Sequence, residues 1–208
     1  MRRQTRLLPV AGLPGIRLHQ AADVTETWRA AVEILRDPDV GLPFWAFPWA
    51  GGLAVARHVG DHPEAVAGLD VLDIATGSGI CAIVAARSGA AAVRAVDIDP
   101  LAEAAAHLNA RANEVKVTIR RVDLLDAPPP QVDVILAGDI CYEETMSNRM
   151  LAWLRLAAAT GTRVLVGDPG RAWFPADLVR IGTYEVTTSR ELEATETRTA
   201  AVYEVPPS

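Results

Sequence analysis

Five aspartates at or just after the ends of short apolar segments are the residues of this chain best suited to do chemistry. They are Asp73, Asp97, Asp123, Asp139 and Asp168. When such segments form a parallel sheet, their carboxyl ends meet along one edge, and ligands bind in the crevice beyond it. Carboxylates attract positive charge and repel phosphates. We therefore expect a site for a cationic molecule at this edge.

The glycine-rich turn after Asp73 fits two cofactor fingerprints. The stretch VLDIATGSGICA, residues 71–82, contains G-x-G-x-x-A from Gly77, with the acid Asp97 twenty residues later. That pattern is typical of the turn that carries a dinucleotide pyrophosphate to a helix N-terminus. From Asp73 the same stretch spells D-x-A-x-G-x-G, which is close to the turn that binds S-adenosylmethionine.

Charge discriminates between the two cofactors. No Arg or Lys lies between Val71 and Ala86, so repulsion between Asp73 and a pyrophosphate would be uncompensated. At an effective dielectric near 20, two unit charges about 4 Å apart interact by about 4 kcal/mol. The sulfonium and ammonium of S-adenosylmethionine are instead attracted to carboxylates. The turn favours this methyl donor, and a dinucleotide dehydrogenase or an accidental glycine turn are the alternatives.

Residue type indicates individual roles within the donor site. Gly77 and Gly79 permit positive φ and close approach of the backbone to the methionine part of the donor. Asp97 is expected to bind the ribose, and Asp123 the adenine amino group. The whole predicted donor-binding set is Trp49, Gly52, Asp73, Ala75, Thr76, Gly77, Gly79, Asp97, Ile98, Asp123, Leu124 and Gly138.

Alternating strand and helix patterns must position these residues. We expect strands over 71–75, 93–97, 115–122, 132–137, 163–167, 184–188 and 199–205, and helices over 79–88, 100–113, 145–158 and 176–181. Repeated strand–helix units predict helices on both faces of a parallel sheet. The expected fold is α/β: a Rossmann-like, doubly wound, mostly parallel seven-stranded sheet with a C-terminal antiparallel strand pair.

The chain is expected to form one structural unit with two parts. Residues 1–62 are expected to form an N-terminal arm and helices that help cover the cofactor, and residues 63–208 the Rossmann-like domain. The first 22 residues contain four arginines and no acid, and we expect them to be disordered or loosely packed. Apolar spacing predicts helices over 21–35 and 53–59, which flank a segment rich in Pro and Trp.

Composition excludes several classes of partner. The net charge of −6 and a pI near 5.2 argue against nucleic acid. No apolar run approaches the ~18 residues of a membrane span. Cys81 and Cys141 lie in predicted core elements, so we expect reduced thiols and a cytoplasmic location. Neither the cysteines nor the histidines have metal-ligand spacing, so we expect no metal. We expect a monomer or weak dimer.

Several stretches between Pro43 and Glu193 carry a family resemblance. VLDIATGSG, AVDIDP and VDLLD match the first motif and the second- and third-strand acids of the class I S-adenosylmethionine-dependent methyltransferases, which the chain resembles. More specifically, through PFWAFPWAGG, LAGDICYEE, VLVGDPGRAWF and TTSRELE it is similar to the lysine methyltransferases of the electron-transfer-flavoprotein β-subunit and their bacterial relatives. Most members have glycine at the position of Ala75, where alanine is expected to tolerate the strand-end conformation.

The resemblance implies S-adenosylmethionine-dependent methylation of a protein lysine. It suggests electron-transfer flavoprotein β-subunit as the acceptor, with a ribosomal protein or a small amine as alternatives. A second alternative is an NAD-dependent oxidoreductase.

The resemblance also implies the acceptor site. In GDICYEE, Asp139 and Tyr142 match the D-x-x-Y/F motif at which the acceptor nitrogen meets the sulfonium. Asp139 would orient the amine as a catalytic residue, and Tyr142 would offer an aromatic wall for a cation–π contact. The structural alternatives are a helix N-cap for Asp139 and packing beneath a loop for Tyr142.

Three further features have two interpretations each. Trp49, with the glycines that follow it, resembles the segment that folds over the cofactor, or it is part of a hydrophobic plug. Asp168 and Arg171 are expected beside the acceptor path as substrate-binding residues, or they pair with each other. The glutamates at 191, 193 and 196 are expected in a solvated turn between the last two strands.

Overall fold

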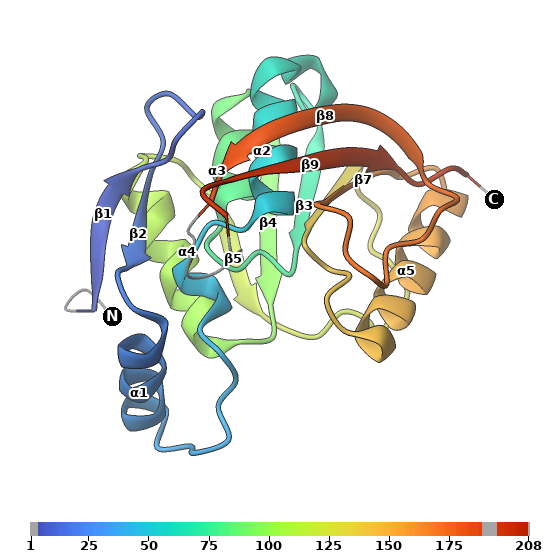
Figure 1. Ribbon diagram of the computed structural model, residues 1–208. Coiled ribbons are helices and arrows are strands. Elements are labelled where there is room, and N and C mark those ends of the chain that lie inside the picture. Colours follow the sequence, from blue (N-terminus) through green and yellow to red (C-terminus); the bar gives the residue numbers. More distant parts are fainter. Residues whose placement is uncertain (1–3, 189–194, 208) are drawn as a thin grey trace.

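A seven-stranded sheet forms the centre of the protein (Figure 1). The computed structural model describes residues 4–188 and 195–207. The strand order is β5-β4-β3-β6-β7-β9-β8. The strands are β3 (Asp70–Ile74), β4 (Ala92–Asp97), β5 (Thr118–Arg121), β6 (Val134–Gly138), β7 (Arg163–Asp168), β8 (Val179–Thr187) and β9 (Thr197–Glu204). The first five strands in this order, β5, β4, β3, β6 and β7, are parallel, and β8 and β9 form the antiparallel pair. The predicted fold class is therefore confirmed.

Helices cover both faces of the sheet. They are α2 (Ala50–Asp61), α3 (Ile80–Arg87), α4 (Pro100–Ala112) and α5 (Glu144–Ala159). Val134 and Leu136 of β6 pack in one core cluster with α2 and α3, whereas Ile135 and Ala137 pack in another with α5. This alternation follows from the two-residue period of a strand.

The winding of the chain reverses between β3 and β6. After β3 the chain adds β4 and then β5 on one side, whereas β6 and β7 lie on the other side. The carboxyl ends of β3 and β6 therefore flank the crevice in which open α/β sheets bind ligands.

Residues 4–22 do not form a loose arm, so the prediction is wrong for this part of the chain. They contain an antiparallel hairpin of β1 (Thr5–Pro9) and β2 (Arg17–Ala21), which precedes α1 (Val24–Leu35). Ile16 and Leu18 of the hairpin are buried in the same core cluster as α2 and α3. Burial of these apolar side chains stabilises the hairpin on the domain.

Asn109 of α4 ties the hairpin to the glycine turn. Its side chain is fully buried; Oδ1 accepts a hydrogen bond from the N–H of His19 at 2.7 Å, and Nδ2 donates to the carbonyl of Ser78 at 2.8 Å. One side chain therefore connects three segments that are far apart in the sequence.

Replacing Asn109 with alanine is expected to lower the free energy of unfolding by about 1–3 kcal/mol, because a buried N–H and a buried carbonyl lose their partners. Urea unfolding measures this change. His107→Ala is the matched control, since His107 is exposed on the same helix. Equal unfolding midpoints for the two variants would contradict a bracing role for Asn109.

Two local predictions are corrected by the structure. The helix expected over 176–181 is wrong: the chain makes a turn and β8 begins at Val179, because pairing with β9 outweighs local helix propensity. Helix α2 begins at Ala50, earlier than the predicted residue 53. Of the three glutamates predicted in a turn, Glu196 is exposed before β9, whereas Glu191 and Glu193 lie outside the described residues.

Two further findings concern expectations from composition. Among residues 4–188 and 195–207, no helix is both long enough and apolar enough to cross a membrane. Cys81 and Cys141 are buried free thiols.

Candidate functional site

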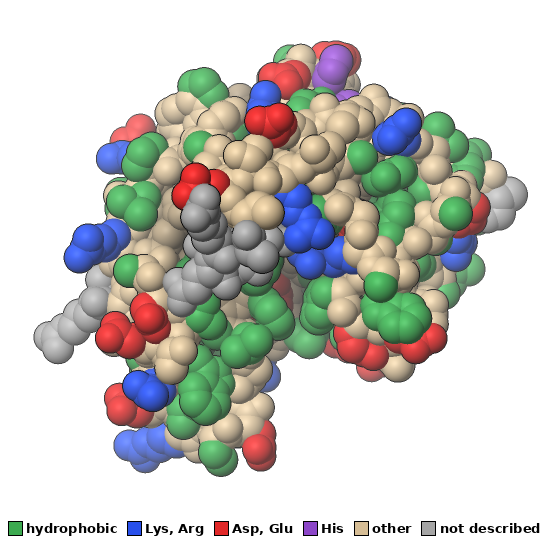
Figure 2. Space-filling model, viewed as in Figure 1, with side chains coloured by type: hydrophobic (Ala, Val, Ile, Leu, Met, Phe, Trp, Pro, Cys, Tyr) green, Lys and Arg blue, Asp and Glu red, His purple; other side chains and the backbone are tan. Residues whose placement is uncertain are grey.

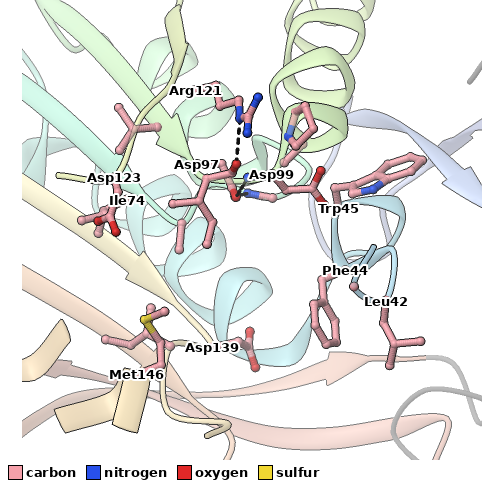
Figure 3. A pocket seen from close by; sticks show the side chains of 18 of the residues that line it. Leu42, Phe44, Trp45, Ile74, Asp97, Asp99, Arg121, Asp123, Asp139 and Met146 are labelled. Atoms are coloured by element: carbon pink, nitrogen blue, oxygen red, sulfur yellow. Dashed lines mark hydrogen bonds between the residues drawn. The ribbon is translucent and has the colours of Figure 1, made fainter. Parts of the chain in front are cut away.

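A pocket of about 820 Å³ lies at the carboxyl ends of β3, β4 and β6 (Figure 3). Eleven of the predicted site residues line it: Trp49, Ala75, Gly77, Asp97, Ile98, Asp123, Leu124, Gly138, Asp139, Tyr142 and Arg171. The segment after α1 contributes further lining residues, among them Leu42 and Phe44. The strand-end reasoning therefore located the pocket.

Five predicted residues do not line the pocket, and they support it from beneath or beside. They are Gly52, Asp73, Thr76, Gly79 and Asp168. Asp73 is buried; its carboxylate accepts hydrogen bonds from the Thr76 hydroxyl and from the N–H of Ala82, which ties the turn to the first turn of α3. Burial raises the pKa of Asp73 to about 7. Its charge therefore contributes less to ligand selection than the sequence argument assumed.

The lining residues give the pocket an excess of negative charge. The acids are Asp37, Asp39, Asp97, Asp99, Asp123 and Asp139, against two arginines, Arg121 and Arg171. Arg171 was expected beside the acceptor path, but Arg121 at the end of β5 was not predicted, and neither arginine is a sequence neighbour of the glycine turn. Six carboxylates against two guanidiniums still favour a cationic ligand over a pyrophosphate.

The turn after β3 has left-handed backbone at three positions. The φ angles are +53° at Ala75, +52° at Gly77 and +83° at Gly79. Ala75 was expected in a strand-end conformation, but its backbone is left-handed instead. Its Cβ costs about 1 kcal/mol at such a φ, which explains why glycine suits this position.

Asp97 joins the turn to the pocket. Its Oδ2 accepts a hydrogen bond from the N–H of Gly77 at 2.8 Å, and its Oδ1 accepts one from the N–H of Asp99 at 3.0 Å. Burial is the main cause that raises the pKa of Asp97. Each oxygen keeps a second lone pair, so the carboxylate is positioned to accept from ligand hydroxyls.

Asp123 is held at the end of β5 by its own neighbours. Its Oδ2 pairs with Arg149 of α5 at 3.0 Å, and its Oδ1 accepts from the N–H of Leu125 at 2.9 Å. The loop that closes this end of the pocket is thereby attached to α5.

Asp139 lies at the opposite end of the pocket, after β6. Its φ is +55°; its Oδ2 accepts from the N–H of Gly52 at 2.8 Å, and its Oδ1 accepts from Nη2 of Arg171 at 2.7 Å. Burial raises the pKa of Asp139 to about 6, and the Arg171 guanidinium opposes that rise. The alternative that Asp139 caps the next helix is wrong, because Glu143 caps α5.

Three glycines, Gly51, Gly138 and Gly167, bring α2 close enough for Gly52 to donate to Asp139. A Cβ on Gly51 would lie 2.2 Å from the carbonyl oxygen of Gly167, and a Cβ on Gly167 would lie 2.1 Å from that of Gly51. A Cβ on Gly138 would lie 2.6 Å from Cα of Gly52. The backbones of α2, β6 and β7 therefore touch directly, and a side chain at Gly51, Gly138 or Gly167 would push the N-terminus of α2 away from the site.

Three aromatic rings lie together in the wall of the pocket, those of Phe44, Trp49 and Tyr142. The Phe44 ring lies 5.6 Å from that of Trp49 and 5.5 Å from that of Tyr142, between ring centroids. Trp49 Nε1 donates to the Phe44 carbonyl at 2.8 Å. Trp45 is buried against α4, as the plug interpretation expects, and Trp49 packs against the same cluster; both also line the pocket, as Tyr142 does.

Asp168 and Arg171 have different roles, and their side chains do not form the predicted pair. Asp168 is buried, and its Oδ1 accepts from the N–H groups of Gly170 and Arg171, at 2.7 Å each. The Arg171 guanidinium instead reaches Asp139. Asp168 thus shapes the turn from which Arg171 projects into the pocket.

Several lining residues were missed from the sequence: Leu42, Phe44, Trp45, Asp99, Arg121, Met146 and Met150. Phe44 and Trp45 lie in the Pro- and Trp-rich segment and Arg121 lies two residues before Asp123, so position alone would have found them. Met146 and Met150 had no local signal, because they arrive through the packing of α5. Within the described part of the chain, no cluster of His, Cys, Asp or Glu could hold a metal ion.

Comparisons with known proteins agree with this architecture. The family model for ribosomal protein L11 methyltransferase (PrmA) matches residues 62–142. The crystal structure of magnesium protoporphyrin IX methyltransferase from Synechocystis PCC 6803 with bound SAH has a TM-score of 0.54 at 16% identity, covering 88% of this chain and 95% of that one. This likeness supports the fold.

Two relatives share one name, electron transfer flavoprotein beta subunit lysine methyltransferase. The protein from Danio rerio is 38% identical over 169 residues, which are 80% of this chain and 64% of that protein. The protein from Homo sapiens is 34% identical over 184 residues, which are 88% of this chain and 69% of that protein. The chain therefore spans about two thirds of the length of these relatives.

Proposed function

Because the chain belongs to the family of electron transfer flavoprotein β-subunit lysine methyltransferases, we propose that it transfers methyl groups from S-adenosylmethionine to lysine side chains of a protein. The proposed acceptor is the β-subunit of electron-transfer flavoprotein, the protein named in these relatives. The observation that carries the proposal is a single pocket with donor-type carboxylates at one end and Asp139 among aromatic rings at the other.

The residues of the pocket fit the methyl donor. Asp97 would hold the ribose hydroxyls, Gly77 would let the backbone approach the methionine part, and Asp123 would meet the adenine amino group. The acidic excess of the lining suits a ligand with a sulfonium and an ammonium. When bound, S-adenosylmethionine supplies a methyl group whose bond to sulfur breaks, with the electron pair staying on sulfur, as the acceptor nitrogen bonds to carbon.

The other end of the pocket fits an alkylamine. Phe44, Trp49 and Tyr142 present ring faces and edges to a lysine stem and its positive end. Asp139 accepts a hydrogen bond from the nitrogen and orients it. A lysine of pKa about 10.4 is only about 0.04% neutral at pH 7, so the site must also favour the deprotonated amine.

A ribosomal protein is the second candidate acceptor. The family model named for L11 methylation covers residues 62–142, which include the donor half and Asp139 but not Arg171. The residues that distinguish acceptors therefore lie mainly outside that match. The first candidate is favoured because the named lysine methyltransferases match across 80% to 88% of the chain.

We also propose a class of partner, a cellular location and an oligomeric state for the enzyme. Acidic and basic side chains are interspersed on the face shown in Figure 2, which fits a protein partner better than nucleic acid. Residues 35–49 contribute to the pocket wall, which supports a covering role for the N-terminal part. The two buried free thiols support a cytoplasmic location, and we include a monomer or weak dimer in the proposal.

Two measurements test the proposal together. Thermal shifts with S-adenosylmethionine, S-adenosylhomocysteine and NAD are expected to show stabilisation by the first two ligands. Mass spectrometry of purified electron-transfer flavoprotein, incubated with enzyme and donor, is expected to show additions of about 14 Da for each methyl group that replaces a hydrogen. Stabilisation by NAD alone would overturn the donor assignment, and an unmodified β-subunit would overturn the acceptor.

Asp97→Ala is expected to weaken binding of S-adenosylhomocysteine by about 1.5–3 kcal/mol, because hydrogen bonds to a charged carboxylate are lost. Asp97→Asn is expected to lose less, since one oxygen remains to accept from Gly77 or the ribose. Isothermal calorimetry measures both variants, with the exposed Asp177→Ala as the control. Wild-type affinity in Asp97→Ala would remove this residue from the donor site.

A further inference from the structure

Arg171 forms an ion pair with Asp139 at the acceptor end of the pocket. Nη2 lies 2.7 Å from Oδ1, and the two side chains are 19% and 11% exposed. The other oxygen accepts from the N–H of Gly52. Each carboxylate oxygen therefore has one donor from the chain and one lone pair left for a ligand.

This pairing resolves a difficulty in the proposed chemistry. A lone carboxylate beside a lysine raises the pKa of the lysine, and it thus stabilises the ammonium that cannot accept a methyl group. A guanidinium stays charged in proteins and offsets that field. The pair keeps its hydrogen-bond acceptors but has no net charge.

We propose that Arg171 is a positioning residue that offsets the charge of Asp139, so that the site binds the acceptor lysine as the neutral amine. This inference rests on the proposed function. As the lysine enters, one proton leaves the ammonium for water. A remaining N–H donates to Asp139, and the lone pair of the nitrogen stays available to form the bond to the methyl carbon.

The surroundings of Arg171 hold it for this role. Its guanidinium carbon lies 6.0 Å from the centre of the Trp49 ring, within range of a cation–π contact. Asp168 accepts from the backbone N–H of Arg171, which fixes the turn that carries the side chain. Asp168 does not line the pocket, and this contact explains how it still contributes to the site: it holds the backbone of Arg171.

The other ionisable groups near the pair do not replace Arg171. Cys81 of α3 and Cys141 after β6 face Asp139, and burial raises the pKa of both thiols, so they are neutral at physiological pH. Asp168, at the end of β7, interacts electrostatically with Asp139, and Arg198 of β9 interacts electrostatically with Asp168. Of these groups Arg171 is the cation in direct contact with the Asp139 carboxylate.

Proton release on acceptor binding tests the proposal directly. Electron-transfer flavoprotein is titrated into the enzyme saturated with S-adenosylhomocysteine, at pH 8, in buffers with different ionisation enthalpies. The wild-type enzyme is expected to release about one proton per lysine bound, since the free lysine is protonated at this pH. Arg171→Gln is expected to release less than half of that, and Arg171→Lys to restore part of it. Equal release from wild type and Arg171→Gln would overturn the proposal.

A second measurement needs no acceptor. The 13C signal of the Asp139 carboxyl, followed by NMR against pH, is expected to titrate near the value of about 6 in the wild type. Arg171→Gln is expected to move the midpoint upward by about 1 pH unit, which leaves the carboxyl mostly ionised at the pH 8 of the titration, and Arg171→Lys is expected to shift it less. Arg155→Gln is the matched control, since Arg155 pairs with Asp177 on the surface. An unchanged midpoint in Arg171→Gln overturns the proposal even if no flavoprotein binds, which separates its failure from that of the proposed function.

Discussion

Asp139→Asn is expected to lower the rate of methyl transfer by about 10²- to 10³-fold while leaving the affinity for S-adenosylhomocysteine within about twofold. In the proposed function the carboxylate accepts a hydrogen bond from the incoming nitrogen, and it lies at the end of the pocket away from Asp97 and Asp123. Initial rates with purified electron-transfer flavoprotein and calorimetry with S-adenosylhomocysteine measure the two effects.

Asparagine is the informative replacement because of the backbone. Asp139 has a φ of +55°, which asparagine adopts more readily than alanine does. The asparagine carbonyl can still accept from the N–H of Gly52, so the contact with α2 has a partner. Asp177→Asn makes the same chemical change at an exposed position outside the pocket, and it serves as the control. Activity within about tenfold of wild type would show that Asp139 positions no nitrogen in the transition state.

Gly51→Ala is expected to destabilise the protein by at least about 2–3 kcal/mol, because the new methyl group would meet backbone. Its Cβ would lie 2.2 Å from the carbonyl oxygen of Gly167 and 2.7 Å from Oδ2 of Asp139. For a chain of this size the loss corresponds to a fall in Tm of about 4–12 °C. Thermal unfolding followed by circular dichroism measures it.

Gly60→Ala is the matched control, since both glycines lie in α2. A Cβ on Gly60 would lie 3.8 Å from Val84 Cγ1, which is ordinary contact. The control is expected to be neutral or up to about 1 kcal/mol more stable, because alanine is the better helix former. Equal Tm values for the two variants would show that α2 can move away from β6 and β7 at little cost. Loss of activity in a folded Gly51→Ala protein would indicate that α2 had moved from Asp139.

Local patterns in the sequence determined most of the fold and the strand-end residues of the proposed donor site. Buried strands end in aspartates, and the glycine turn after the first of them begins a helix, so short-range periodicity is enough to place Asp97 and Asp123 at one sheet edge. The hairpin at residues 5–21 was not predicted, because Asn109 and the buried face of the domain stabilise it from far along the chain.

Tertiary structure alone decided the partners of Asp139. Gly52 lies 87 residues before it and Arg171 lies 32 residues after it, and neither distance follows a helix or strand period. The contact with Gly52 exists because Gly51, Gly138 and Gly167 let α2 approach two strands, backbone against backbone. Motif spacing predicts a carboxylate after β6, but the charge balance of this carboxylate depends on packing between distant segments, because each contact forms only when the sheet has formed.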